Sequence, residues 1–348
     1  MGRMEQQVEH DVVGGLGLLT LNRPAALNAL TPEMVAALAA ALERWREDPS
    51  VGGVVLRSAS PRAFCAGGDV RAARATVLAG EPEAADAFYA AEYALNGRIA
   101  AFPKPYVSLI DGLVMGGGLG ISVHGAVRVV TERAVFAMPE TRIGFFPDVG
   151  ASWFLPRLGE ALGRYLGLTG ARLDAAQALE CGLATHFVPG AELPALEEAL
   201  RAGGAGGAGE GVVATVERFA RPAPAVDAAW TERRALIERC FGDGRLPEIL
   251  RRLAAEPGEW ARATLAELSG FSPTSLALTA ELLARGAASA DLEVCLEREL
   301  ILARRMARGH DFAEGVRALL VDKDLAPKWR PDDLAGVDVR PWLADVPR

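Results

Sequence analysis

Two glycine-rich turns and two carboxylates are the residues of this sequence best suited to chemistry. Gly116–Gly118 is a run of three glycines, and a second turn, AFCAGGD, ends at Asp69. Glycine lets a backbone approach a ligand because it has no Cβ, and N–H groups at a helix start point outward, where the helix dipole favours negative charge. Glu140 and Asp148 follow the glycine run. Backbone donors for an anion, with two carboxylates downstream, indicate acyl chemistry.

The segment around these groups reads as short buried strands separated by turns. Its apolar run Tyr106–Ile110 predicts one strand, and Val135–Met138 predicts another that ends just before Glu140. A compact apolar segment follows the three glycines. Asp148 comes directly after a Phe-Pro turn signal. Both carboxylates are therefore expected in turns, and a turn aspartate with no other role is an alternative for Asp148.

The residues before this segment predict strands and helices in a repeating order. Leu16–Asn22 and Val51–Arg57 read as strands, and Thr31 followed by Pro32 is a strong helix start. Asp69 is expected to cap another helix. The order strand-strand-helix favours a layered α/β core over a doubly wound sheet, where single strands alternate with helices.

The second half of the chain is predicted to be mainly helical. One helix should end at Gly170, and the Gly/Ala-rich stretch 202–211, AGGAGGAGEG, reads as a flexible linker or loop. Beyond it the apolar residues recur at helical spacing. We therefore expect a core over 1–201, the linker over 202–211, and a helical C-terminal region over 212–348.

Composition indicates a soluble enzyme and argues against several other classes. The chain has 348 residues, 50% of them hydrophobic, and a formal net charge of −8, which disfavours nucleic acid as a partner. No apolar run is long enough to cross a membrane, and the N-terminus has neither signal-peptide nor transit-peptide character. The four cysteines are far apart and form no CxxC pair, so we expect reduced thiols, no metal site and a cytoplasmic location.

Three motifs in order, AFCAGGD, MGGGLG and MPETRIGFFPDVG, resemble the crotonase (enoyl-CoA hydratase/isomerase) superfamily. Within it, SVHG, FFPDVGAS and RGHDFAEGVRALLVDKDLAPKW are similar to the 3-hydroxyisobutyryl-CoA hydrolases. The similarity runs from LNRPAALNAL near the start to Trp329. It implies a crotonase-like spiral of ββα units with a helical C-terminal region.

The resemblance also implies how a CoA thioester would bind. Its carbonyl oxygen would lie between the N–H groups of Gly68 and Gly117, and one such donor stabilises the developing charge by about 3–4 kcal/mol. Substrate contacts are then expected from Ala66, Gly67, Glu92 and Gly116. On its own, each glycine loop reads as a tight turn; together they favour the oxyanion hole.

One departure from the family pattern bears on the reaction. Hydratases of the superfamily use two glutamates around one water, and the first position here is Gly120. Glu140 matches the second, and Asp148 matches the hydrolase pattern. Glu140 would either activate water as a general base or attack the thioester to give a mixed anhydride, and both routes are open. Asp148 would bind the substrate hydroxyl or steer protons.

The oxyanion hole and the two carboxylates lead us to expect acyl chemistry, and the resemblance implies a thioester hydrolase that cleaves 3-hydroxyisobutyryl-CoA, or a similar short 3-hydroxyacyl-CoA, in valine breakdown. No cofactor is expected, since coenzyme A is part of the substrate, and a homo-oligomer is possible. The alternatives are an enoyl-CoA isomerase or hydratase and a noncatalytic CoA-binding protein. His124, His186 and Cys65 are expected to be structural, because no partners at metal-ligand or triad spacing accompany them.

Overall fold

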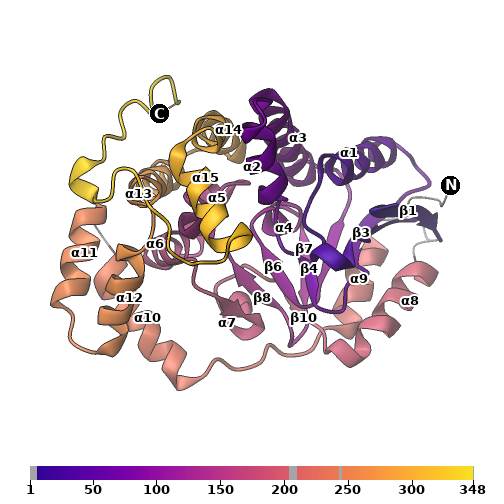
Figure 1. The fold of residues 1–348 in the computed structure, drawn as a ribbon. Helices are drawn as coiled ribbons and strands as arrows, with labels where there is room; N and C mark the ends of the chain where they lie inside the picture. Colours follow the sequence, from indigo (N-terminus) through magenta and orange to yellow (C-terminus); the bar gives the residue numbers. More distant parts are fainter. Residues whose placement is uncertain (1–5, 204–209, 243–244, 348) are drawn as a thin grey trace. The chain divides into compact units, whose positions relative to one another are not determined.

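The computed structural model describes residues 6–203, 210–242 and 245–347, which form two compact units (Figure 1). The first unit is drawn from Met1–Gly68, Ala94–Phe136 and Leu173–Val226. The second consists of Asp69–Tyr93, Ala137–Arg172 and Asp227–Arg348. The chain therefore passes between the units several times, whereas the sequence had suggested consecutive regions over 1–201 and 212–348.

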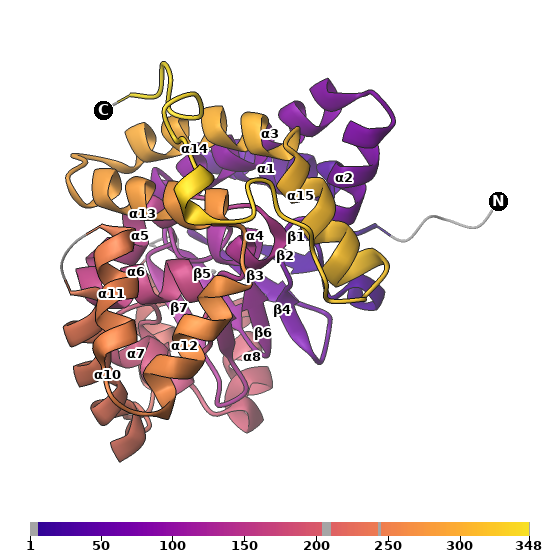
Figure 2. The same ribbon diagram turned by 60° about the vertical axis from the view of Figure 1, so that its left-hand side comes forward.

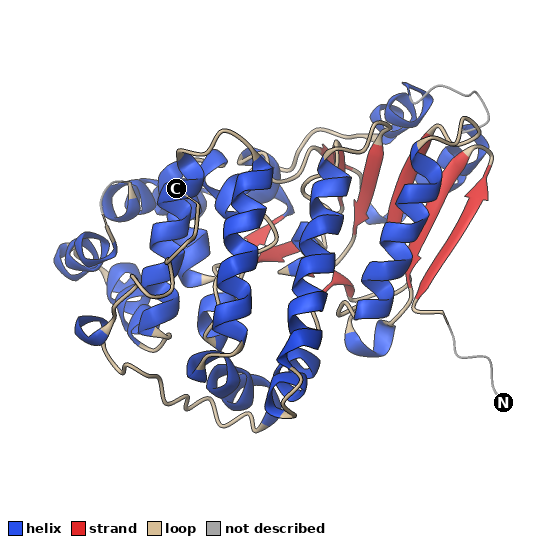
Figure 3. Cartoon of the chain, turned by 90° about the horizontal axis from the view of Figure 1, so that it is seen from above, coloured by secondary structure: helices blue, strands red, loops and turns tan. Residues whose placement is uncertain are grey.

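A six-stranded sheet forms the centre of the first unit, and Figure 3 shows its strands in red. Its strands are ordered β1-β2-β3-β5-β7-β10, and only the β1–β2 pair is antiparallel. Their bounds are β1 Val8–Val13, β2 Leu16–Leu21, β3 Gly53–Ser58, β5 Tyr106–Ile110, β7 Val127–Val130 and β10 His186–Phe187. Every residue of β2 and β5 is buried, as expected for parallel strands covered on both faces. The strands predicted over 16–22, 51–57 and 106–110 are confirmed.

Helices on this unit complete its core. On one face, α8 (Leu193–Gly203) and α9 (Glu210–Phe219) place Leu196, Leu200, Val212 and Val216 among buried side chains of the sheet. Burying each such side chain contributes roughly 1.5–3 kcal/mol. The helix α1 (Pro32–Arg46) begins as predicted, with Thr31 Oγ1 accepting from the Met34 N–H. Its Trp45 lies so close to Gly17 that a Cβ there would be 2.6 Å from the indole ring.

A second sheet in the first unit sets up the glycine-rich turns. It has the order β4-β6-β8-β9, with β4 Ala63–Cys65, β6 Leu113–Met115, β8 Val135–Ala137 and β9 Leu173–Asp174. Strands β4 and β6 are parallel. Their carboxyl ends therefore lie at the same edge, and the loops that leave them start from neighbouring points.

The second unit is mainly helical. Figure 2 shows α10, α11 and α12 on the same side of this unit, where α10 and α12 contact α6 and α11 contacts α10 and α12. Helix bounds are α2 Val70–Leu78, α5 Ala151–Arg157, α6 Glu160–Thr169, α10 Ala228–Phe241, α11 Leu246–Ala255, α12 Glu259–Ser269, α13 Pro273–Ala287, α14 Leu292–Ala307 and α15 His310–Val316. Helix α3 (Pro82–Ala100) starts in this unit and continues into the first. The predicted cap Asp69 accepts a backbone hydrogen bond as expected, and Ser272 caps α13 in the same way.

The remaining expectations concern the linker and the membrane. Most of the 202–211 stretch lies outside the described residues, and α8 and α9 flank it. Among the helices that the structure describes, none is long and apolar enough to cross a membrane.

Candidate active site

The two glycine-rich turns pack against each other through their backbones. Gly67 has a φ of +100°, and a Cβ there would lie 3.2 Å from the Met115 carbonyl oxygen. A Cβ on Gly118 would lie 2.5 Å from the Cys65 carbonyl oxygen. No side chain fits between two backbone segments this close, so glycine is required where the two loops meet. Pairing of β4 with β6 thus brings the predicted residues Gly67, Gly68, Gly116 and Gly117 to one edge of the second sheet.

The Gly68 and Gly117 N–H groups are the two predicted oxyanion donors. Gly117 is the first residue of α4 (Gly117–Gly120), a single turn, so its N–H has no partner within the helix. Within the described part of the chain, neither N–H donates a hydrogen bond to protein. The apolar segment after the glycines is helical for one turn only.

Neighbouring backbone groups hold these turns in place. The Gly67 carbonyl accepts from the Leu30 N–H at 2.8 Å, and the Ala66 N–H donates to the Leu27 carbonyl at 3.0 Å. The Gly116 carbonyl accepts from the Leu119 N–H at 2.8 Å. The Ala66 N–H therefore stabilises the fold and is not free to donate to a substrate. The buried Cys65 thiol hydrogen-bonds the Asn28 carbonyl oxygen at 3.1 Å.

Glu140 starts a short 3-10 helix, Glu140–Ile143, in the second unit. Its side chain is buried, and Oε2 has no hydrogen-bond partner among the described residues. The helix ends at Gly144, whose φ is +72° and where a Cβ would lie 2.1 Å from the Asp311 carbonyl oxygen. A C-terminal helix thus packs directly against the turn that follows Glu140.

Asp148 is also buried, unlike an ordinary turn aspartate, and the Tyr93 hydroxyl donates to its Oδ2 at 2.7 Å. Its carbonyl accepts from the Ala151 N–H at 2.9 Å. The two following residues have left-handed backbones, with φ +55° at Val149 and +86° at Gly150. This conformation is unfavourable for a β-branched residue, so the surrounding structure must hold the turn in place.

Glu92, on α3 in the same unit, is the third predicted carboxylate. It is 2% exposed, and its Oε1 lacks a hydrogen-bond partner among the described residues. Glu92 and Glu140 thus each bury a carboxyl oxygen that a bound molecule could pair. Such unpaired buried oxygens are rare in folded proteins and often mark functional sites.

Burial raises the pKa of all three carboxyl groups. Desolvation raises the pKa of Asp148 to about 6, and the hydrogen bond from Tyr93 opposes this by favouring the ionised form. Burial and then the charge of Asp148 raise the pKa of Glu92 and of Glu140 well above the usual value. Because neighbouring buried carboxylates resist ionising together, Asp148 takes the negative charge first. Perturbed carboxyl groups of this kind are typical of acid–base sites.

Sequence reasoning missed three further polar residues of this region. They are Tyr93, which binds Asp148; Tyr89, whose buried hydroxyl has no partner among the described residues; and Glu299 on α14. Tyr89 stacks on Phe145 with 5.6 Å between ring centroids. One signal was available for Glu299: it lies at helical spacing with Cys295 and Leu302, all buried, so a charge interrupts an apolar face.

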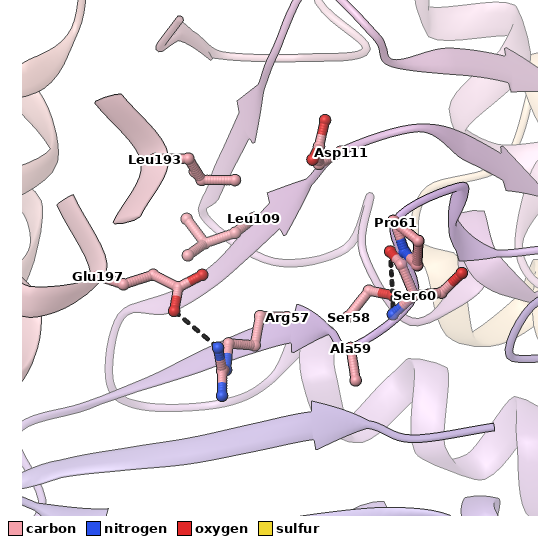
Figure 4. A pocket seen from close by; sticks show the side chains of 9 residues that line it. All are labelled: Arg57, Ser58, Ala59, Ser60, Pro61, Leu109, Asp111, Leu193 and Glu197. Atoms are coloured by element: carbon pink, nitrogen blue, oxygen red, sulfur yellow. Dashed lines mark hydrogen bonds and ion pairs between the residues drawn. The ribbon is translucent and has the colours of Figure 1, made fainter. Parts of the chain in front are cut away.

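A separate cavity of about 210 Å³ lies at the carboxyl ends of β3 and β5 in the first unit (Figure 4). Its charged groups are already paired: Arg57 with Glu197 at 2.8 Å, and Asp111 with Thr131 at 2.6 Å. We assign no chemistry to this cavity. Among the described residues, no group of three His, Cys, Asp or Glu side chains could hold a metal ion.

Curated relatives cover almost the whole chain. The mitochondrial 3-hydroxyisobutyryl-CoA hydrolase of Rattus norvegicus is 43% identical over 326 residues, which are 93% of this chain and 84% of the relative. That of Homo sapiens is 42% identical over 328 residues, with the same two coverages.

These names contradict the expected cytoplasmic location. Both relatives are called mitochondrial, and so is that of Xenopus laevis. Our expectation rested on reduced cysteines and on the N-terminal residues. Reducing conditions are not confined to the cytoplasm, so unpaired cysteines do not identify the compartment.

A solved structure shares the fold. The crystal structure of a carnitinyl-CoA dehydratase from Mycobacterium thermoresistibile superposes with a TM-score of 0.90 at 39% identity, covering 99% of this chain and 97% of that one. The predicted α/β spiral with a helical C-terminal region is thereby confirmed. The sequence profile of the family described as enoyl-CoA hydratase/isomerase matches residues 16–344. With a match of this extent and curated relatives above 40% identity, the chain belongs to the enoyl-CoA hydratase/isomerase family.

Proposed function

We propose that this protein hydrolyses the thioester of 3-hydroxyisobutyryl-CoA, or of a similar short 3-hydroxyacyl-CoA, to the free acid and CoA, as a step of valine breakdown. The names of the curated relatives support this substrate. The observation that carries the chemistry is the buried pair Glu140 and Asp148, together with Gly120 at the position of the first hydratase glutamate. A carboxylate pair suits activation of water at a carbonyl carbon.

In the proposed reaction, the thioester carbonyl oxygen accepts hydrogen bonds from the Gly68 and Gly117 N–H groups. Support for this comes from the two N–H groups, which lack protein acceptors in the described residues, and from the close packing of their loops. Fixed donors stabilise the oxyanion without having to reorganise as charge develops.

Glu140 then acts as the base. It removes a proton from a water molecule whose oxygen bonds to the thioester carbon, and the carbonyl electron pair moves onto oxygen. As that pair returns, the C–S bond breaks, and Glu140 delivers its proton to the departing CoA sulfur. Burial, and after it the charge of Asp148, raises the pKa of Glu140, so the Glu140 carboxylate is a stronger base whenever it is ionised. Asp148 can also accept a hydrogen bond from the substrate hydroxyl.

A covalent route uses the same groups. The Glu140 carboxylate would attack the thioester carbon and expel CoA thiolate, and water, with Asp148 as base, would then attack the Glu140 carboxyl carbon of the mixed anhydride and release the free acid. Single turnover in ¹⁸O-labelled water separates the routes. Label found in Glu140 by peptide mass spectrometry would establish the anhydride; label found only in the acid product would favour direct attack by water.

A second candidate is hydration or dehydration at a carbon–carbon double bond, as the name of the Mycobacterium protein indicates for that structure. Adding water across a double bond needs acid and base at two carbons, and Gly120 has no side chain to supply one of them. Hydrolysis is therefore favoured over hydration.

The test measures thiol release from 3-hydroxyisobutyryl-CoA and hydration of crotonyl-CoA on one preparation, with Glu140→Ala as the control. We expect rapid CoA release that Glu140→Ala abolishes, and no hydration. Hydration without CoA release would overturn the proposal. The reaction as proposed requires water and placed donors but no metal or other cofactor, and the proposed partner is the acyl-CoA. We propose a homo-oligomer as well, to be tested by light scattering.

A further inference from the structure

Glu299 on α14 is a fully buried carboxylate that the reaction above does not use. Three donors point at it. The Gly150 N–H lies 2.6 Å from Oε2 and the Ser152 N–H lies 2.9 Å from Oε1, which also accepts from the Ser152 hydroxyl. All three donors belong to the turn that follows Asp148.

This turn opens α5, and the start of a helix leaves N–H groups that need acceptors. The residue at the cap position is Gly150, which has no side chain to provide one. Glu299 therefore caps α5 from a helix almost 150 residues further along the chain. A carboxylate with two oxygens can hold both N–H groups at once, which fixes the direction in which the chain leaves Asp148.

The backbone between Asp148 and these donors is under strain. Val149 has a positive φ, which is unfavourable for a β-branched residue, whereas glycine at position 150 adopts its positive φ freely; without a restraint the backbone at Val149 would relax toward ordinary angles. The turn also meets α13, where a Cβ on Gly286 would lie 1.7 Å from the Ser152 carbonyl oxygen. Glu299 and α13 therefore both restrain the turn.

The position of Asp148 depends on that turn. Its carbonyl accepts from the Ala151 N–H inside the same turn, and its carboxylate must reach the Tyr93 hydroxyl on α3. A rotation of the turn would move Asp148 away from that hydroxyl. Burial raises the pKa of Glu299 to about 8, although its three donors lower that pKa. Burying this carboxyl group therefore costs free energy of folding.

We propose that Glu299 is a positioning residue for the hydrolase reaction: through Gly150 and Ser152 it holds the 148–152 turn so that the Asp148 carboxylate stays against the Tyr93 hydroxyl. This inference rests on the proposed function, because it assigns Glu299 a role in that reaction.

The test compares Glu299→Gln with Glu297→Gln, an exposed glutamate on the same helix. Glutamine keeps the size of the side chain but puts an NH₂ group, which cannot accept, beside one of the donors. We expect kcat for 3-hydroxyisobutyryl-CoA to fall about 30-fold in Glu299→Gln with KM within about threefold, as for a group that acts on the reaction rather than on binding. Glu297→Gln should match the wild type.

A crystal structure of Glu299→Gln provides a readout that does not depend on activity. We expect the Tyr93–Asp148 hydrogen bond to be broken. If the wild type hydrolysed no thioester, the proposed function would fail, while this structure would still decide whether Glu299 positions Asp148. An unmoved turn, or an unchanged kcat in a folded variant, would overturn the inference. Should Glu299→Gln not fold, Ser152→Ala removes one donor only, and a lower kcat at constant KM with no loss of melting temperature is then the expected result.

Discussion

The glycine turns of the first unit and the carboxylates of the second offer two kinds of chemical group. In the first unit the candidate groups are backbone N–H groups, held by strand pairing between β4 and β6 and by loop contacts that only glycine permits. In the second unit they are side chains from α3, the 3-10 helix at Glu140 and the turn before α5, all buried. One region is built by the backbone, the other by side chains.

This difference has consequences for how each region responds to change. Backbone donors carry no titratable group, so pH leaves them unaltered, while an added methyl group displaces them. The carboxylates tolerate substitutions that keep the shape of the side chain, but their charge depends on pH, because burial raises the pKa of each. Variants that change the backbone geometry therefore test the glycine turns, and variants that change a charge test the carboxylates.

The largest effect should come from the carboxylate region. Glu140→Gln keeps the shape of the side chain and removes its basicity, and we expect kcat to fall by about 10³-fold or more with little change in KM. Steady-state CoA release measures both. Retention of a tenth of the activity would show that another group is the base, and Asp148 would be the next to test.

A smaller loss is expected from the glycine turns. Gly118→Ala would place a Cβ 2.5 Å from the Cys65 carbonyl oxygen and push the two loops apart. We expect a decrease in kcat of about 10²-fold, as for loss of one oxyanion donor, and the same decrease at every pH. Gly270→Ala is the matched control, since its Cβ would meet only the Glu267 carbonyl oxygen, at 3.4 Å. A pH-dependent loss would contradict the comparison.

The sequence predicted these two regions unequally, for a physical reason. Gly67, Gly117 and Glu140 lie in short motifs where a turn, a cap or a strand end can be recognised from adjacent residues. Capping by Thr31 and Asp69 and the helix end at Gly170 were predicted correctly for the same reason. Such features depend on local backbone preferences.

Contacts between distant segments could not be predicted in this way. Tyr93 meets Asp148 across 55 residues, and Glu299 meets Gly150 across 149 residues. In the sequence, Tyr93 is one aromatic residue of an amphipathic helix, and only folding shows which acceptor its hydroxyl finds. The interleaving of the two units has the same origin, because it follows from packing between segments rather than from the composition of any one of them.

The charge of Asp148 should also affect stability. Its pKa is about 6 in the folded protein, against 3.8 for an unperturbed aspartate, so folding favours the protonated form. The stability contributed by that protonated group is present below about pH 4 and is lost as pH rises through about 6. Asp148→Asn, which stays neutral, should therefore be more stable than the wild type by about 1–3 kcal/mol at pH 8, and equally stable at pH 4. Urea unfolding at both pH values measures this, and equal stability at pH 8 would argue against a desolvated Asp148.

The smallest effect, and the most specific, concerns the hydrogen bond from Tyr93 to Asp148. Tyr93→Phe removes a donor that lowers the pKa of Asp148, so that pKa should rise. At pH 8 we expect kcat to fall about tenfold, the usual value of a hydrogen bond to a charged group. The acid limb of the pH–rate profile should move to higher pH, making the loss larger at pH 6. Tyr165→Phe, a buried tyrosine that packs on Phe241 instead, should leave the profile in place. If both variants moved the limb equally, the shift would reflect general loosening of the second unit, and the separation between a backbone-built and a charge-built region would have to be abandoned.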